Sequence, residues 1–474
     1  MTKVLMKYKA KLLLLSKDIR FWIILLFVIR LYGITNPPLD AASTWRQTDV
    51  LMIARNFYEI DSNILFPRTD SAGDLSGIVG VEFPIYNYLI FLVSLAFGFE
   101  SWYGRLINLI ITSIGTLYFY KLIKNYFGES SAFYSSLTLL VSMWFSYSRI
   151  TIPDVFAASI CIIGLYYAFQ YLEKGKAAFL FVFFVLGLLG CLAKISAAPI
   201  LTCLAIPLFI NRIPLNRKVV VSLLASVILA SVCYWYFVWV PYLNSTYQFG
   251  GYFFMGLPVH VGFQQLIQEW SPALDQFFVT PLKYTGLAVF LASIYLMARN
   301  KLWAALIAFL LPLVAFSLFI VKSGRWFAVN DYYPLVSIPI FAFAVGIGLD
   351  QIKSKTIAII LLVIISIEGI GDQIHVFKIR QPNTSLLSLE STLDKITLPT
   401  DLIAINSDGS PTPMFCAHRK GWNLTNEYLS NLQNLDFLKS KGCKFIIILK
   451  IFNSNINLEL PKVFDSHEFS VYKL

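Results

Sequence analysis

The chain has 474 residues, of which 57% are hydrophobic and only 14% are charged, and its formal net charge is +11 at pH 7. Soluble globular domains carry about 25% charged residues, so this composition excludes a soluble globule and indicates a polytopic membrane protein. The positive charge does not indicate nucleic-acid binding. Lysine and arginine fall in short connectors between apolar runs, where the positive bias of cytoplasmic loops explains them.

Apolar runs of about 17–25 residues are long enough to cross a membrane as α-helices. We therefore predict an α-helical polytopic membrane protein with about eleven spans, on that same length criterion. No cleavable signal peptide is expected, because the first run lacks a small-residue cleavage site and is interrupted by Arg30. The predicted spans lie near 19–35, 103–121, 131–147, 155–172, 177–193, 195–211, 217–240, 282–298, 301–321, 332–349 and 355–371.

The apolar run at 84–99 decides the predicted topology. Counted as a span, it would put Asp40 and Asp154 on opposite faces and would invert the charge bias of every later connector. As an interfacial or re-entrant helix, it leaves the basic connectors on the cytoplasmic side together with the lysine-rich N-terminus. We therefore expect the C-terminus outside and three extracytoplasmic segments: the loop 36–83 followed by the interfacial helix 84–99, the loop 241–281, and the C-terminal residues.

The composition changes sharply after the last apolar run. Strands are expected at 401–406, 444–449 and 469–474, with a helix at 426–441 whose leucines recur at helical spacing. We predict a transmembrane domain over 1–371 and a small extracytoplasmic α/β domain over 372–474. Two cysteines of this domain, Cys416 and Cys443, are either a disulfide in an oxidising compartment or two unpaired structural thiols.

The first exterior loop carries Asp40, an ionisable residue flanked by Pro37, Pro38 and nearby aromatics. A carboxylate close to the headgroup plane is partly desolvated and is suited to act as a general base. The competing interpretation is a helix N-cap for the segment that follows.

Residues 48–60 have the pattern of an amphipathic helix resting on the membrane surface. Arg55 and Glu59 lie at i,i+4 on this helix, and their simplest interpretation is a solvated surface ion pair.

Two other charged residues lie at the predicted outer ends of spans. Asp154 begins a span, so a first-turn role next to the helix dipole competes with a catalytic role. Lys194 lies between two apolar runs, where it either snorkels to the interface or binds a lipid phosphate. A further outer cluster combines an arginine, whose planar fork suits phosphate, with aromatic side chains that suit sugar rings or polyprenyl chains. Its members are Lys322, Arg325, Asp331, Tyr332 and Tyr333.

The order of motifs along the chain resembles the GT-C membrane glycosyltransferases, in the branch similar to the protein O-mannosyltransferases and the lipid A aminoarabinose transferase. The resemblance covers essentially the whole chain. The residues that carry it are Asp40, the runs 45–49 and 53–57, the run 82–86, Arg105, Arg149 with Pro153 and Asp154, the run 190–194, the run 331–334 and the run 419–422.

The resemblance implies an inverting transfer of a sugar from a polyprenyl-phosphate donor to a hydroxyl of a glycan, lipid or protein acceptor at the extracytoplasmic membrane face. Asp40 then acts at the acceptor and Asp154 supports the site. Some family members use a divalent metal, for which Glu82 with His260 is the candidate pair. The residues expected to bind substrate are Arg46, Gln47, Arg55, Glu82, Tyr86, Lys194, Arg325, Asp331, Tyr332 and Tyr333.

The chain departs from these families at two places. Asp40 is followed by Ala41 where the mannosyltransferases have Asp-Glu, and Glu82 is followed by Phe83 and Pro84 where the aminoarabinose transferase has Lys-Pro-Pro. The usual lysine near the donor phosphate is therefore missing, and its positive charge has to come from another basic side chain. The candidates are Arg46, Lys194 and Arg325.

A membrane transporter or lipid flippase is the alternative function, and a polysaccharide polymerase is a third possibility. A transporter predicts ionisable residues in the middle of spans, broken helices and related halves. In this sequence the charged residues gather at the outer ends of spans, with Arg30 and Glu368 as the main exceptions. The glycosyltransferase is therefore the preferred function.

Overall fold

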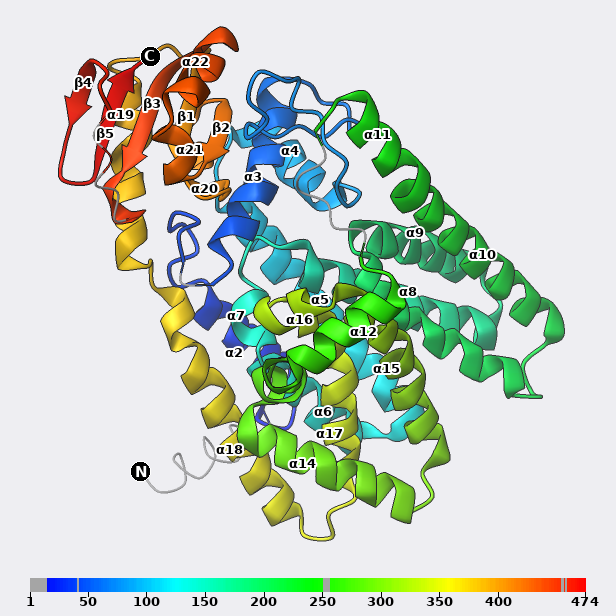
Figure 1. Cartoon of the computed structure of the whole chain (residues 1–474). Helices are drawn as coiled ribbons and strands as arrows, with labels where there is room; N and C mark the ends of the chain where they lie inside the picture. Colours follow the sequence, from blue (N-terminus) through cyan, green and yellow to red (C-terminus); the bar gives the residue numbers. More distant parts are fainter. Residues whose placement is uncertain (1–14, 41, 250–255, 453–455, 457) are drawn as a thin grey trace. The chain divides into compact units, whose positions relative to one another are not determined.

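The computed structural model describes residues 15–40, 42–249, 256–452, 456 and 458–474 (Figure 1). These residues form two compact units. The first, called here the transmembrane unit, contains the described residues within 1–34, 105–235 and 254–377. The second, called here the loop unit, contains the described residues within 35–104, 236–253 and 378–474, so the first predicted exterior loop shares a unit with the C-terminal residues.

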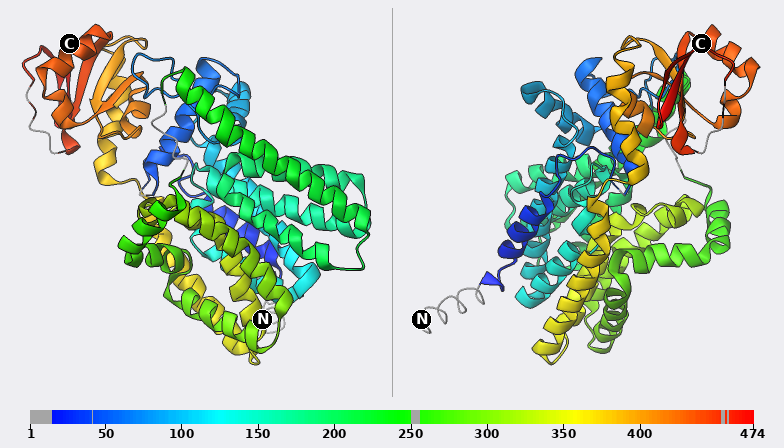
Figure 2. Two further views of the ribbon diagram at one scale, coloured as in Figure 1. Left: turned by 45° about the vertical axis from the view of Figure 1, so that its right-hand side comes forward. Right: turned by 90° about the vertical axis from the view of Figure 1, so that its left-hand side faces the viewer.

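The transmembrane unit is all-helical, and its longer helices run alongside one another (Figure 2). Its helices are α2 (Ile19–Arg30), α5 (Tyr103–Phe127), α6 (Glu129–Val141), α7 (Trp144–Tyr147), α8 (Pro153–Lys174), α9 (Ala177–Ala193), η1 (Ile195–Phe209), α10 (Leu215–Tyr234), α12 (Val259–Gln268), α13 (Trp270–Leu274), η3 (Asp275–Val279), α14 (Thr280–Arg299), α15 (Trp303–Ser323), α16 (Arg325–Val329), η4 (Tyr333–Ser337), α17 (Ile338–Asp350), α18 (Lys355–Gln373) and η5 (Ile374–Phe377).

Within the described residues, 7 continuous helical segments are long and apolar enough to cross a membrane, which confirms a helical polytopic membrane protein. The other four predicted runs form shorter helices, namely α2, α6, α9 and η1. η1 is a 3-10 helix of 15 residues with Pro199 and Pro207 inside it. Because a 3-10 helix rises about 2.0 Å per residue, η1 extends roughly 30 Å, which matches the hydrocarbon thickness of a bilayer.

Small residues allow the helices of this unit to approach closely, as in many membrane bundles. α17 packs against α6 and α14, and a Cβ atom placed on Gly348 of α17 would overlap Ser293 of α14. Gly346, half a turn earlier, faces Ser135 of α6 in the same way. The glycines therefore set the distance between α17 and its two neighbours.

We predict that Gly348→Ala lowers the thermal stability of the detergent-purified protein, because overpacking a tight contact costs about 1–3 kcal/mol. The matched control is Gly371→Ala in α18, where a Cβ meets nothing within 4 Å. Melting temperatures of the two variants and the parent chain test this. Equal melting temperatures for both variants would contradict the packing role of Gly348.

The loop unit contains the helices α3 (Thr44–Glu59) and α4 (Ile85–Phe97). α3 does not have the predicted solvent-facing side, because every residue from Gln47 through Phe57 is buried. α3 packs against α4 and against α20 (Thr412–Ala417), so the interpretation as an amphipathic surface helix is wrong. α4 has 13 residues, about 20 Å at 1.5 Å per residue, and is too short to cross a bilayer as a straight helix.

The C-terminal part of the loop unit is a five-stranded sheet with the order β2-β1-β3-β5-β4. β1 pairs in parallel with β2 and β3, whereas β5 is antiparallel to β3 and β4. The strands are β1 (Leu402–Asn406), β2 (Gly421–Leu424), β3 (Cys443–Leu449), β4 (Lys462–Asp465) and β5 (Phe469–Lys473). The remaining helices are η2 (Trp235–Trp239), which begins at the unit boundary, α11 (Val240–Thr246), η6 (Gln381–Ser388), α19 (Leu389–Leu393), α21 (Asn426–Leu429), α22 (Leu432–Ser440) and η7 (Lys450–Phe452).

The sheet confirms the three predicted strands and the α/β character of this part. The predicted single helix at 426–441 is divided into α21 and α22, because Asn431 caps α22 by accepting a hydrogen bond from the backbone of Gln433. The disulfide alternative is wrong, since Cys416 and Cys443 are both free thiols. Cys443 is instead part of the sheet core, against Ala404 and Leu438.

Candidate functional site

A buried ion pair lies at the start of α8 in the transmembrane unit. Pro153 occupies the first turn of α8, where its missing N–H costs nothing, and Asp154 follows it in the same turn. The Asp154 carboxylate is 3.5 Å from Lys194 Nζ, and the two side chains are 2% and 11% exposed. The first-turn position of Asp154 is confirmed. Snorkelling of Lys194 is wrong, because its ammonium group is buried beside a carboxylate.

Two buried polar side chains hold the turn that precedes Asp154. Asn108 of α5 donates from Nδ2 to the carbonyls of Ile150 and Ile152, at 2.7 and 3.3 Å. Arg149 is fully buried and donates to the carbonyls of Arg30 and Tyr32, at 3.0 and 2.9 Å. Arg149 therefore satisfies carbonyl groups at the end of α2.

Two further residues join Asp154 and Lys194 in what we call the Asp154 cluster. The Tyr332 ring centroid is 6.0 Å from Lys194 Nζ, a cation–π distance. Asp331, next to Tyr332, accepts a 2.5 Å hydrogen bond from the hydroxyl of Tyr147. Asp154, Lys194, Asp331 and Tyr332 thus lie in one unit, with two carboxylates, one ammonium group and an aromatic face.

Tyr147 is a member of this network that the sequence did not single out. It belongs to the short helix α7, which the hydropathy pattern merges with the preceding apolar run. No local motif distinguishes a tyrosine that donates to a distant carboxylate from a tyrosine of an interfacial belt.

The other predicted residues of this unit have different surroundings. Arg325 is exposed, and its guanidinium lies 5.1 Å from the centre of the Trp326 ring. Over the described parts of the chain, Arg325 has no ion-pair partner. Tyr333 stacks edge-on against Tyr332, with ring centroids 5.0 Å apart.

In the loop unit, Asp40 is completely buried. Its backbone forms an antiparallel bridge with Ile379, and the backbone N–H of Arg380 donates to the Leu39 carbonyl at 3.2 Å. The N-cap residue of α3 is Ser43, so the N-cap alternative for Asp40 is wrong. Backbone pairing with the segment that leads into the C-terminal sheet therefore sets the position of this carboxylate.

Arg46 lies between two carboxylates of the loop unit. Its guanidinium is 3.1 Å from Asp49 and 2.5 Å from Glu82, and the three side chains are 17%, 5% and 16% exposed. This bridge ties α3 to the segment that precedes α4. The group of three has a formal charge of −1, which makes Arg46 a weaker candidate for a donor phosphate than Lys194 or Arg325.

Gln47 and Tyr86, expected to bind substrate, are both buried in the loop unit. Gln47 donates from its side-chain amide to the Ala42 carbonyl at 3.3 Å, and the Tyr86 hydroxyl donates to the Gly104 carbonyl at 2.7 Å. These contacts hold the ends of α3 and α4 in place.

Arg55 does not form the predicted surface pair with Glu59. Its guanidinium is 3.0 Å from Asp70, donates to the Phe415 carbonyl at 3.2 Å, and lies 4.6 Å from the centre of the Phe415 ring. The Arg55 side chain is only 5% exposed. Asp70 also accepts from Asn56 at 2.9 Å, so this network connects α3, the loop after it and α20.

Glu59 instead pairs with His418, which also contacts Glu390. The His418 ring nitrogens are 3.0 Å from Glu59 and 2.6 Å from Glu390. The hydrogen bonds to Glu390 and Glu59 raise the pKa of His418 to about 9, against a smaller lowering by burial and by the charge of Arg55. His418 is therefore protonated at neutral pH. This triad was not found from the sequence, where the three residues are far apart.

We predict that protonated His418 stabilises the protein, and that this stability is lost at alkaline pH. Its ordinary pKa is 6.5 and the folded-state pKa is about 9, so its contribution is fully present below about pH 6.5 and is lost as the pH rises through 9. Melting temperatures measured from pH 6 to pH 10 should fall at the alkaline end for the parent chain and much less for His418→Gln.

The control for this measurement is His467→Gln, which changes an exposed histidine of the same unit. This variant should keep the alkaline decrease of the parent chain. The role given to His418 is refuted if His418→Gln and the parent chain lose stability in parallel between pH 8 and pH 10.

A metal site is not apparent in the described ranges, which contain no group of three or more His, Cys, Asp or Glu side chains placed to hold an ion. Glu82, one of the predicted ligands, is engaged with Arg46. His260, the other, is exposed and belongs to the transmembrane unit.

We compared the sequence and the structure with those of known proteins. Residues 82–237, about a third of the chain, match the family described as dolichyl-phosphate-mannose-protein mannosyltransferase. No curated protein matches the chain by sequence.

Solved structures match over nearly the whole chain. ArnT from Cupriavidus metallidurans bound to undecaprenyl phosphate has a TM-score of 0.59 and 12% identity, covering 95% of this chain and 98% of that one. The oligosaccharyltransferase of Archaeoglobus fulgidus complexed with Zn and sulfate has a TM-score of 0.58 and 14% identity, covering 90% and 67%. AglB from the same organism, with an inhibitory peptide and a dolichol-phosphate, has a TM-score of 0.56 and 14% identity, covering 91% and 70%.

Proposed function

We propose that this chain, which has the fold of the GT-C membrane glycosyltransferases and resembles ArnT and the O-mannosyltransferases, transfers a sugar from a polyprenyl-phosphate donor to an acceptor hydroxyl. The observation that carries the proposal is the fully buried Asp40, a carboxylate held by backbone pairing in a unit built from the first predicted exterior loop. Support for the donor class comes from two proteins of similar fold, one bound to undecaprenyl phosphate and one to a dolichol-phosphate.

In the proposed reaction, Asp40 accepts the proton of the acceptor hydroxyl while the oxygen attacks the anomeric carbon of the sugar. The bond between this carbon and the phosphate oxygen breaks on the opposite face, so the configuration inverts. The electron pair leaves with the polyprenyl phosphate. A carboxylate can take this proton when it lies within hydrogen-bond reach of the acceptor hydroxyl.

The leaving phosphate needs positive charge that is present before the reaction. Lys194 is the proposed source, since its ammonium group is buried beside Asp154 and Tyr332. Asp154 then keeps Lys194 charged and oriented, while Tyr332 and Tyr333 offer ring faces to the sugar. Arg325, exposed and free of an ion-pair partner among the described residues, supplies a second charge.

The other predicted substrate-binding residues receive positioning roles. Arg46 with Glu82, and Arg55 with Asp70, join α3 to neighbouring segments of the loop unit. Gln47 and Tyr86 hold the ends of α3 and α4. We also propose that the reaction takes place at the extracytoplasmic face, because this orientation leaves all the basic connectors in the cytoplasm. The sugar is a hexose or pentose and the acceptor a glycan, lipid or protein; a divalent metal is compatible with this scheme.

The contacts of the two charged residues inside predicted spans do not favour the transporter alternative. Arg30 donates to the Leu26 carbonyl at 2.9 Å and to the Ser148 hydroxyl. Glu368 accepts from the backbone N–H groups of Tyr284 and Thr285 at 3.1 and 2.9 Å. Arg30 thus bonds to groups near the end of α2, and Glu368 accepts from backbone N–H groups that follow the kink at Lys283 inside α14, so a structural role explains both charges without a transport pathway.

We predict that Asp40→Asn abolishes sugar transfer without loss of folded protein, because an amide of the same shape accepts no proton at neutral pH. Transfer of radiolabel from a panel of sugar-phosphate polyprenols is measured in membranes that contain equal amounts of each variant. Asp61→Asn, which changes a half-buried aspartate of the same loop that pairs with Arg68, should transfer normally. Transfer by Asp40→Asn at the parental rate would eliminate Asp40 as the base.

We predict that Lys194→Met raises the KM for the donor and also destabilises the protein, because breaking a buried ion pair costs about 3–5 kcal/mol. The double variant Asp154→Asn/Lys194→Met removes the unpaired charge and should recover much of the stability but not the donor affinity. Melting temperature and KM are measured on both. An unchanged KM in the double variant would remove Lys194 from the phosphate site.

A further inference from the structure

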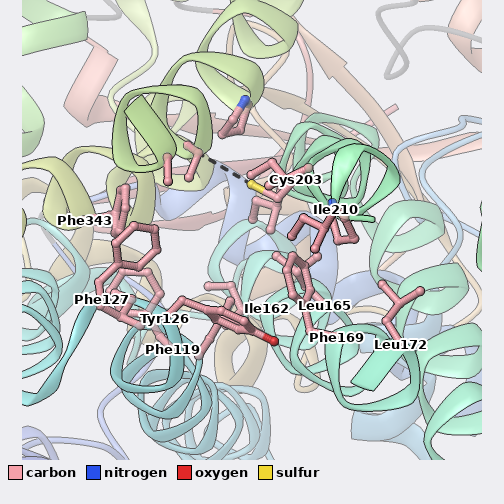
Figure 3. A pocket seen from close by; sticks show the side chains of 18 of the residues that line it. Phe119, Tyr126, Phe127, Ile162, Leu165, Phe169, Leu172, Cys203, Ile210 and Phe343 are labelled. Atoms are coloured by element: carbon pink, nitrogen blue, oxygen red, sulfur yellow. Dashed lines mark hydrogen bonds between the residues drawn. The ribbon is translucent and has the colours of Figure 1, made fainter. Parts of the chain in front are cut away.

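The transmembrane unit contains a cavity of about 250 Å³ between five of its helices (Figure 3). The helices that line it are α5, α8, η1, α15 and α17. Almost all of its lining is apolar, with phenylalanine, leucine and isoleucine side chains prominent in Figure 3. A cavity of this kind accommodates a hydrocarbon chain better than water, because it offers few hydrogen-bond partners.

The geometry of η1 produces one wall of the cavity. In a 3-10 helix, side chains three residues apart lie directly above one another. Ile200, Cys203 and Ile206 are spaced in this way, and all three line the cavity. They form a straight apolar stripe along the helix axis, which an α-helix of the same sequence would have wound around its surface.

The neighbouring wall is made of small residues on α15, which packs directly against η1: the Cys203 thiol lies 3.6 Å from the Ala308 carbonyl oxygen. Ala304, Ala308 and Pro312 follow at intervals of four along α15, so they share one face of this helix, and all three line the cavity. Larger side chains at these positions would fill the space. The small-residue face of α15 and the adjacent stripe on η1 therefore leave space that the side chains of α5, α8 and α17 enclose.

Burial along the lining identifies the open end. Phe119, Ile162 and Ile200 are almost completely buried, whereas Glu173, Arg212 and Ala304 are exposed. Glu173 comes nineteen residues after Asp154 in α8, about 28 Å away at 1.5 Å per residue. The open end therefore lies at the far end of α8 from the Asp154 cluster.

Basic side chains surround this open end. Arg217 donates to the carbonyls of Leu172 and Glu173 at 3.1 and 2.7 Å, and Lys218 donates to the Leu208 carbonyl at 2.9 Å. Arg212 lines the cavity itself and has no ion-pair partner over the described ranges. The only carboxylate in the lining, Glu173, accepts a 2.6 Å hydrogen bond from the Tyr126 hydroxyl. Positive charge thus exceeds negative charge at the opening.

We propose that this cavity binds one acyl chain of an anionic phospholipid, whose phosphate lies against Arg212 and Arg217. The apolar cavity suits the acyl chain of such a lipid, and the basic side chains at its open end suit the phosphate. We call the apolar part of the cavity the slot. The acyl chain of a zwitterionic lipid also fits the slot, but the positive group of its headgroup is repelled by the basic side chains at the open end. This lipid site is separate from the proposed transferase site and does not depend on the proposed reaction.

Native mass spectrometry of the full chain in detergent tests this proposal, with phosphatidylglycerol and phosphatidylcholine of identical acyl chains as probes. The parent chain should retain phosphatidylglycerol more strongly. Arg212→Ala should lower the affinity for phosphatidylglycerol about fivefold, which is the contribution of about one basic residue near an anionic lipid surface. Lys355→Ala, which removes an exposed lysine outside the cavity, should leave its affinity unchanged.

A second pair of variants tests the slot. Ala308→Trp fills the cavity and should abolish retention of phosphatidylglycerol, whereas Val314→Trp on the exposed face of the same helix should retain it. Equal binding of the two lipids, or retention by Ala308→Trp at the parental level, overturns the proposal. Displacement of bound phosphatidylglycerol by an equimolar polyprenyl phosphate would also overturn it, since the slot would then belong to the donor.

Discussion

The high free-energy cost of an isolated charge in an apolar surrounding is the constraint on which the structure of the transmembrane unit depends. Asp154 meets this constraint by pairing with Lys194, and Arg149 meets it by donating to carbonyl groups at the end of α2. These contacts bring the starts of α8 and η1 together and tie the turn before α8 to α2. The same contacts bring carboxylate, ammonium and aromatic groups together. The interactions that hold the helices in contact therefore also assemble the Asp154 cluster.

The loop unit meets the same constraint with segments that are distant in sequence. Arg55 bonds to Asp70 and to the backbone of α20, and His418 lies between Glu59 and Glu390. These ion pairs join the first predicted exterior loop to the C-terminal sheet. The C-terminal residues thereby complete the burial of the helix that follows Asp40.

Sequence patterns predicted the fold well where a single physical rule applies. Long apolar runs identified the helical membrane unit, and alternating or continuous apolar stretches identified β1, β3 and β5. Patterns failed for α3, since buried arginine and asparagine side chains look like a polar face when their partners are unknown. They also failed for Arg55, because a partner at i,i+4 is visible in the sequence and a partner fifteen residues away is not.

The sequence alone determined that the chain is a helical membrane protein with a C-terminal α/β part, because hydrophobicity and periodicity are local properties. It also singled out Asp40, Asp154 and Lys194, since charges next to long apolar runs are conspicuous. Only the tertiary structure decided which charges pair, that Tyr147 reaches Asp331, and that a 3-10 helix opens an apolar slot beside α15. Such pairings depend on distances between segments that are separated along the chain, and no local pattern encodes those distances.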